Sequence, residues 1–102
     1  MIIKGHSMVQ LKKYLIHEIE ESIEFYNIRN KSAAIEFYSE IQNIYRILEF
    51  SPYFEVKFLN IRSIPLNKFP FTIFFTIDFE NQIVNIRSCF HNSQSPYKPP
   101  LF

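Results

Sequence analysis

Two alternating stretches near the C-terminal end constrain the fold of this chain most strongly. Along Phe71–Asp78 every second residue is Phe or Ile, and the intervening positions hold Thr, Phe, Thr and Asp. Ile83–His91 alternates in the same way after the polar segment Glu80–Gln82. A two-residue period is typical of a β-strand with one buried face, and a short polar segment between two such strands indicates a turn. These residues are therefore predicted to form an antiparallel hairpin.

The first half of the chain has the period of helices instead. From Ile16 to Tyr26 apolar residues recur at three- and four-residue steps, with glutamates mostly on the other side, which predicts an amphipathic helix. A second apolar stripe consists of Ala34, Phe37, Tyr38, Ile41, Ile44, Tyr45 and Leu48. The polar segment Asn27–Lys31 is predicted to connect the two helices through about four or five residues, which makes them antiparallel neighbours.

The limits of the second helix are marked in the sequence. Asn30 or Ser32 can cap its start, because either side chain accepts a hydrogen bond from a free backbone N–H group. Ser51–Pro52 ends it, since the residue before proline avoids the helical region. The aromatic residues of the stripe are interpreted as core rather than as a cofactor-binding surface.

Two further strands complete the predicted fold. Val9–Lys13 also alternates. Ile61–Leu66 is a further candidate strand, in which Pro65 suits an edge or a strand end because it has no N–H to donate. The order of elements indicates an α+β fold, in which a helical hairpin packs on an antiparallel sheet of three to four strands. Residues 8–98 are predicted to form one domain. Residues 1–7 are expected to lie outside this domain, as a leader, a misassigned start or a cloning remnant. Residues 99–102 are expected to form a tail.

Composition excludes several functional classes. One Gly among 102 residues leaves little material for a loop that cradles phosphates. The single cysteine, Cys89, cannot form an intramolecular disulfide, which fits a reducing cytosol. The three histidines have no metal-ligand spacing, and no apolar run approaches the roughly 18 residues of a membrane helix. We expect a cytoplasmic protein without a metal, a cofactor or a membrane segment.

Charge is distributed unevenly along the chain. Residues 1–55 carry six Lys/Arg and eight Asp/Glu, whereas residues 56–102 carry five and two. The C-terminal half is compatible with an anionic partner. The cluster Glu18, Glu20, Glu21 and Glu24 is interpreted as a solvated helix face that favours a basic partner segment, with paired-carboxylate catalysis as the alternative.

Four segments, taken in order, resemble toxins of the RelE/ParE superfamily. The first two, Ile19–Tyr26 (IEESIEFY) and Ala34–Pro52, are similar to the family's two helices. Ile61–Phe75 (IRSIPLNKFPFTIFF) is similar to a family core with Arg, apolar alternation, Lys-Phe-Pro-Tyr/Phe and Ile-Phe-Phe/Tyr. Phe90–Pro96 (FHNSQSP) is similar to the family's Phe-His-Thr-Ser-x-x-Pro. The resemblance covers roughly Met8–Lys98.

The resemblance implies the toxin of a bacterial toxin–antitoxin pair, historically called a plasmid stabilisation protein. ParE-like members poison DNA gyrase, and RelE-like members cleave mRNA in the ribosomal A site. The Lys-Phe-Pro-Phe and Phe-His-Asn-Ser pieces look closer to the ParE-like side. We therefore expect a non-enzymatic toxin that binds gyrase and is neutralised by a cognate antitoxin. The alternatives are a ribosome-dependent mRNA endonuclease and an inactive antitoxin-binding or dimerising module.

A nuclease of this kind needs a base for the 2′-OH, cations for the phosphate and an acid for the leaving oxygen. The candidates are Arg62, Lys68, Arg87 and His91, which are equally the candidates for contacting a target without catalysis. Arg87 and His91 lie four residues apart on one strand, so they are predicted to share a sheet face with Cys89. The alternative interpretation makes the arginines solvated charges, His91 a strand-end residue and Cys89 structural. Few Lys/Arg residues in the C-terminal half, and Phe90 where a tyrosine hydroxyl would be needed, favour the non-catalytic toxin.

An antitoxin of this family wraps its toxin as helix and strand, so the toxin must offer an apolar groove or a sheet edge. Candidates are Phe54, Phe58, Phe69, Phe74 and the edge near Ile61–Leu66. Phe74 interrupts a polar alternation, which indicates either an outward partner contact or half-burial under the helical hairpin. The chain is expected to form either a homodimer or a heterotetramer with the antitoxin.

Overall fold

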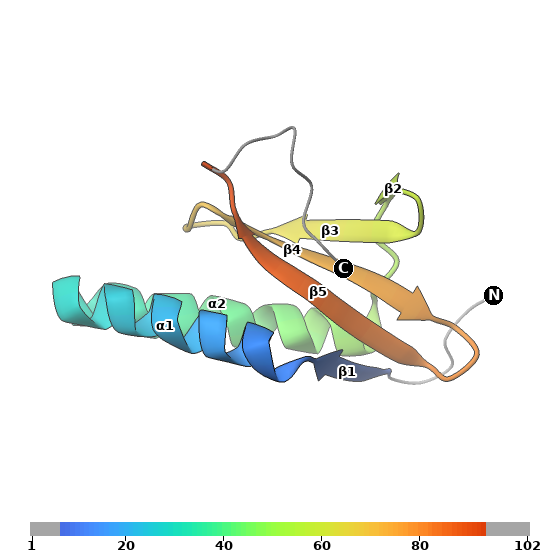
Figure 1. Cartoon of the computed structure of the whole chain (residues 1–102), viewed down its shortest axis with the longest axis horizontal. Coiled ribbons are helices and arrows are strands. Elements are labelled where there is room, and N and C mark those ends of the chain that lie inside the picture. The colour runs from blue at the N-terminus through green and yellow to red at the C-terminus, as the bar shows by residue number, and fades with distance from the viewer. Residues whose placement is uncertain (1–6, 94–102) are drawn as a thin grey trace.

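Two helices lie side by side across one face of a five-stranded sheet (Figure 1). The computed structural model describes residues 7–93. In chain order the elements are β1 Met8–Leu11, α1 Lys13–Arg29, α2 Lys31–Phe50, β2 Val56–Phe58, β3 Ile61–Pro65, β4 Phe71–Asp78 and β5 Ile83–His91. The predicted α+β class is confirmed.

The sheet has the strand order β1-β5-β4-β3-β2. Three of its pairings are antiparallel, but β1 runs parallel to β5. The sheet is therefore mixed, and β2 gives it one strand more than the sequence predicted. β2 escaped prediction because its three residues are all exposed, so no buried alternation marks it.

The predicted hairpin is present, with a register from Phe71↔His91 to Asp78↔Ile83. Asp78 stabilises its turn, because its Oδ1 and Oδ2 accept hydrogen bonds from the backbone N–H (3.1 Å) and Nδ2 (2.8 Å) of Asn81. The ladder is interrupted once, between Phe74 and Phe75. This irregularity determines which way the following β5 residues face.

The two helices are joined by a single residue, Asn30, and the predicted connection of four or five residues is wrong. The Asn30 Oδ1 accepts hydrogen bonds from the N–H groups of Ser32 (3.0 Å) and Ala33 (3.3 Å), and its own N–H donates to the Tyr26 carbonyl (2.6 Å). One asparagine thus ends α1 and caps α2, a cap that contributes about 1 kcal/mol. The helix continues through the residues before Asn30, and their polar side chains are solvated because this end of α1 is exposed.

The core lies between the helices and the sheet. Its buried members are Leu15, Ile19, Phe37, Ile41, Ile44, Leu48, Ile64, Leu66, Ile73, Phe75, Val84 and Ile86. Most of the predicted helical stripe is among them, but Tyr38 is 52% exposed. Neither helix of the described chain has the length and apolarity that a bilayer-crossing segment needs.

Ser7 belongs to the folded part of the chain. It is buried, its N–H donates to the Glu49 carbonyl (2.7 Å), and its Oγ donates to the Leu48 carbonyl (2.8 Å). These bonds satisfy carbonyl groups that the end of α2 leaves without helical partners. The structure thus includes one residue of the predicted leader, while residues 1–6 and the predicted tail, 99–102, lie outside the described range.

A candidate groove for a partner polypeptide

The four residues predicted for a nuclease or target-contact site do not meet on one surface. Arg62, on β3, is bound to residues near its own end of the sheet. Its Nη1 donates to the Phe54 carbonyl (2.8 Å), and its guanidinium carbon lies 5.9 Å from the centroid of the Phe79 ring. Lys68, in the β3–β4 connection, is bound to α2 instead. Its backbone N–H donates to Glu40, and its Nζ lies 3.7 Å from a Glu36 carboxylate oxygen.

Arg87 and His91 lie on opposite faces of the sheet, contrary to the prediction from their spacing. Ser88 pairs with Phe74 and Ile86 with Phe75, so Arg87 is an extra residue in β5. Such a bulge shifts the alternation by one position. The Arg87 Nε donates to Thr76 Oγ1 (3.1 Å) on the face away from the helices. His91 lies on the helix side, with its ring 4.9 Å from that of Phe71.

The four predicted antitoxin-binding phenylalanines also occupy different environments. Phe54 and Phe69 are half-buried and pack edge-on against core rings, 6.2 Å from Phe75 and 5.1 Å from Phe37 respectively. Phe74 lies on the sheet face away from the helices, against Phe90 (6.1 Å), so the helical hairpin does not cover it. Among these four, Phe58 alone is mostly exposed, at 59%.

A groove lies between α1 and the end of β5. Its volume is about 630 Å³, within the range of ligand-binding clefts. The lining residues are Glu18, Ile19, Glu21, Ser22, Phe25, Tyr26, Phe71, Cys89, His91 and Ser93. Hereafter this surface is the α1–β5 groove. His91 is thus the one predicted site residue that belongs to it.

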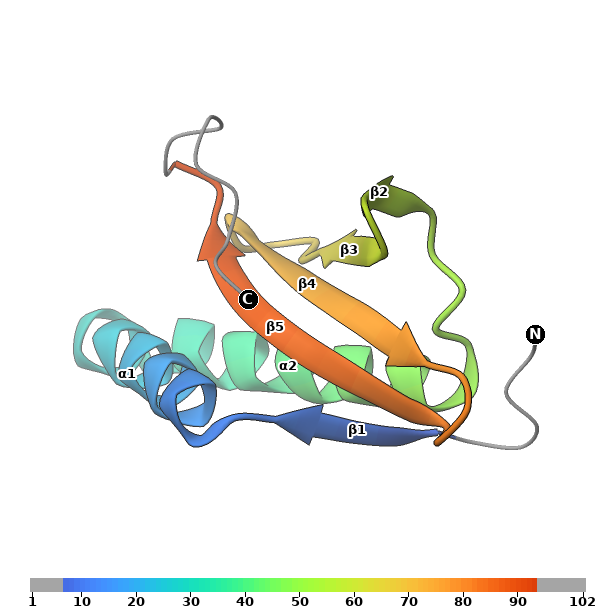
Figure 2. The same cartoon turned by 45° about the vertical axis from the view of Figure 1, so that its right-hand side comes forward.

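One wall of the α1–β5 groove is an unpaired strand edge. β1 pairs only with Ile83–Ile86 of β5. Beyond Ile86, within the described residues, β5 has β4 on one side and no strand on the other. Figure 2 shows β1 beside the first half of β5, and α1 beneath the second half. An unpaired edge offers backbone donors and acceptors to an extended peptide. The predicted edge near Ile61–Leu66 is partly covered, because β2 pairs with Ile61 and Arg62.

The α1–β5 groove combines apolar and acidic surface. Phe25 is 50% exposed although it is a large apolar residue. Glu18 and Glu21 line the groove, whereas Glu20 and Glu24 of the same acidic cluster do not. A partner segment with apolar anchors and basic side chains would complement this surface. The glutamate cluster was the sequence signal for it, but periodicity alone could not show which glutamates face the groove.

Cys89 lies in the α1–β5 groove as a protonated thiol. Burial, with a smaller contribution from Glu18, raises its pKa from 9.0 to about 12. The reactive form of cysteine is the thiolate, so this environment suits a structural cysteine rather than a nucleophile. Within residues 7–93 no group of three or more His, Cys, Asp or Glu side chains could hold a metal ion.

The raised pKa values of Cys89 and of one tyrosine make the stability of the fold depend on pH in the alkaline range. Burial also raises the pKa of Tyr45, from 10.0 to about 12. The unfolded chain therefore loses these two protons at lower pH than the folded chain does. We expect the free energy of unfolding to fall as the pH rises from 9.0 towards about 12. Urea unfolding at about pH 8 and about pH 10.5 would measure the fall. If the free energy of unfolding of a Cys89→Ala/Tyr45→Phe variant fell as steeply with pH as that of the parent, these two residues would not be the source of the pH dependence.

No protein-family model, curated protein or solved structure matches this chain. Function therefore has to be inferred from the residues and their geometry. The feature with the clearest chemical character is the α1–β5 groove, with its unpaired strand edge, its exposed aromatic ring and its acidic side chains.

Proposed function

We propose that this chain is the toxin of a bacterial type II toxin–antitoxin pair and acts in the cytoplasm. In this proposal a cognate antitoxin silences it by adding an extended segment to the free edge of β5 and placing apolar and basic side chains in the α1–β5 groove. The observation that carries the proposal is this groove, because a free strand edge beside exposed apolar surface is what a strand-forming partner requires.

The arrangement of elements supports the same proposal. A strand, a helical hairpin and an antiparallel run of strands are what the resemblance to RelE/ParE-superfamily toxins implies, and the described chain has them in that order. An antitoxin that wraps as helix and strand would find its strand position beside Ser88–His91, where β5 lacks a neighbouring strand on one side within the described residues.

We further propose a ParE-like action, in which the toxin binds DNA gyrase without catalysing a reaction. Its support is the dispersion of the predicted catalytic set. Arg62 and Lys68 are engaged with Phe54 and with α2, and the bulge at Arg87 directs its side chain away from His91. A nuclease built from these four residues would need them around one phosphate. Cleavage of mRNA on the ribosome is the alternative that the experiment must separate.

Controlled expression in bacteria, with and without the adjacent open reading frame, tests the proposal. We expect expression of the chain alone to stop growth, with filamentation and induction of the DNA-damage response, and co-expression of its neighbour to restore growth. Absence of growth arrest would favour an inactive antitoxin-binding module. Translation arrest with cleaved mRNA, lost in Arg87→Ala or His91→Ala, would replace gyrase with the ribosome as target.

A further inference from the structure

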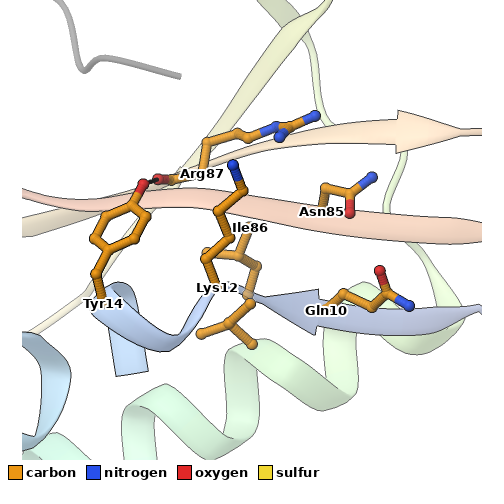
Figure 3. A pocket seen from close by; sticks show the side chains of 7 residues that line it. Gln10, Lys12, Tyr14, Asn85, Ile86 and Arg87 are labelled. Carbon is orange, nitrogen blue, oxygen red and sulfur yellow. Dashed lines mark hydrogen bonds between the residues drawn. The ribbon is translucent and has the colours of Figure 1, made fainter. Parts of the chain in front are cut away.

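A second pocket lies where β1 meets α1, on the opposite side of β5 from β4. Its volume is about 150 Å³, and a cavity of that size holds a ligand as large as benzene. Its polar lining comes from Gln10, Lys12, Tyr14, Asn85 and Arg87. Figure 3 shows the Lys12 and Arg87 side chains rising on the same side of β5, while Ile86 points towards the helices.

The pocket is cationic and holds no compensating carboxylate. Lys12 and Arg87 line it, and none of its lining residues is acidic. Within residues 7–93 neither cation has an ion pair. Arg87 is half-buried, and among the described residues its side chain makes one hydrogen bond, from Nε to the neutral Thr76 Oγ1 (3.1 Å). That bond orients the guanidinium and leaves its terminal N–H groups for another acceptor.

The start of α1 adds to the positive potential. Lys12 is the residue before the helix, and no side chain caps its first N–H groups. The first turn of α1 also has no acidic residue. A helix N-terminus favours anions through these free N–H groups and the helix dipole. Tyr14 lies in this turn, where its hydroxyl donates to the Arg87 carbonyl (3.4 Å) and joins the helix to β5.

We propose that this pocket binds a phosphate group. An oxyanion here would accept hydrogen bonds from the Lys12 ammonium, from the Arg87 guanidinium and from the Gln10 and Asn85 amides. Several donors around one pocket suit the many oxygens of a phosphate, and guanidinium binds two of them at once. The same anion would offset the two positive charges that line the pocket. This site goes beyond the proposed toxin function and does not rest on it.

Titration of the isotope-labelled chain with inorganic phosphate, followed by amide NMR shifts, tests the proposal. We expect saturable shifts at Lys12, Tyr14 and Arg87. Lys12→Gln is expected to weaken binding about tenfold, because it removes one charge-assisted hydrogen bond. Lys13→Gln is the matched control, since Lys13 carries the same charge one residue away but does not line the pocket. It is expected to leave affinity within about twofold, because an exposed charge outside the pocket is screened by salt.

Two further probes identify the source of the phosphate. Uridine 5′-monophosphate presents a terminal phosphate, and the dinucleotide UpU presents an internal phosphodiester. Shifts at the same residues with the monophosphate alone would indicate a free phosphate or monoester, and shifts with UpU would indicate a nucleic-acid backbone. Absence of saturable shifts with all three probes would overturn the proposal. An equal loss of phosphate affinity in Lys12→Gln and Lys13→Gln would also overturn the proposal, because it would show a general effect of net charge.

Discussion

Replacement of Phe37 by alanine is expected to lower the free energy of unfolding by about 3–5 kcal/mol. Phe37 is 0% exposed. Its ring centroid lies 5.1–5.3 Å from the ring centroids of Tyr26, Phe69 and Phe71. Removal of the ring leaves a cavity at the point where α1, α2 and the sheet meet. A domain of this size has only about 5–15 kcal/mol of total stability, so the loss is a large part of it.

Tyr38→Ala is the matched control for this prediction. Tyr38 is the next residue of α2 and is aromatic, but it is 52% exposed, so its loss is expected to cost about 1 kcal/mol or less. Urea-induced unfolding, followed by circular dichroism, measures both values. Similar losses for the two variants would mean that the face of α2 packed against the sheet is not the one described above.

Reversal of charge at Glu18 and Glu21 is expected to weaken antitoxin binding by about 100-fold. Both residues line the α1–β5 groove. Lysine at both positions would place like charges against a basic partner segment, a juxtaposition that costs several kcal/mol. The product of the adjacent open reading frame is the ligand, and isothermal titration calorimetry gives the affinity. The double variant should remain toxic and escape neutralisation. This prediction rests on the proposed function.

The control is Glu20→Lys together with Glu24→Lys. It makes the same change of charge on the same helix, outside the groove, and is expected to change affinity by less than about threefold. Because exposed charges are screened by salt, the difference between the two double variants should shrink at high ionic strength. Equal weakening by both pairs would show that the acidic face acts through net charge, and the partner would then dock elsewhere.

The bulge in β5 connects the two surfaces. The irregular pairing opposite Phe74 and Phe75 sends Arg87 to the outer face and leaves Cys89 and His91 on the helix side. A bulge commonly redirects a side chain near a functional site. Here one extra residue in β5 places Arg87 at the phosphate pocket while Cys89 and His91 line the α1–β5 groove.

The local elements of this protein could be read from its sequence. Periods of two and 3.6 residues record which side of a strand or helix is buried, so the hairpin, the two helices and most of the core residues followed from them. The resemblance in Ile61–Phe75 and Phe90–Pro96 suggested the functional class. Short exposed elements could not be predicted this way, because the three residues of β2 and the one residue between the helices are too few to establish a period.

Only the tertiary structure decided how those elements combine into surfaces. The parallel pairing of β1 with β5 brings Lys12 and Arg87 to one pocket although 74 residues separate them. The bulge depends on how β5 matches β4, and sequence spacing assumes regular alternation. A period describes a residue's relation to its own element, whereas pairing and register depend on contacts between elements. For that reason the sequence alone determined most of what would be buried, and the folded chain determined which surfaces would be left open.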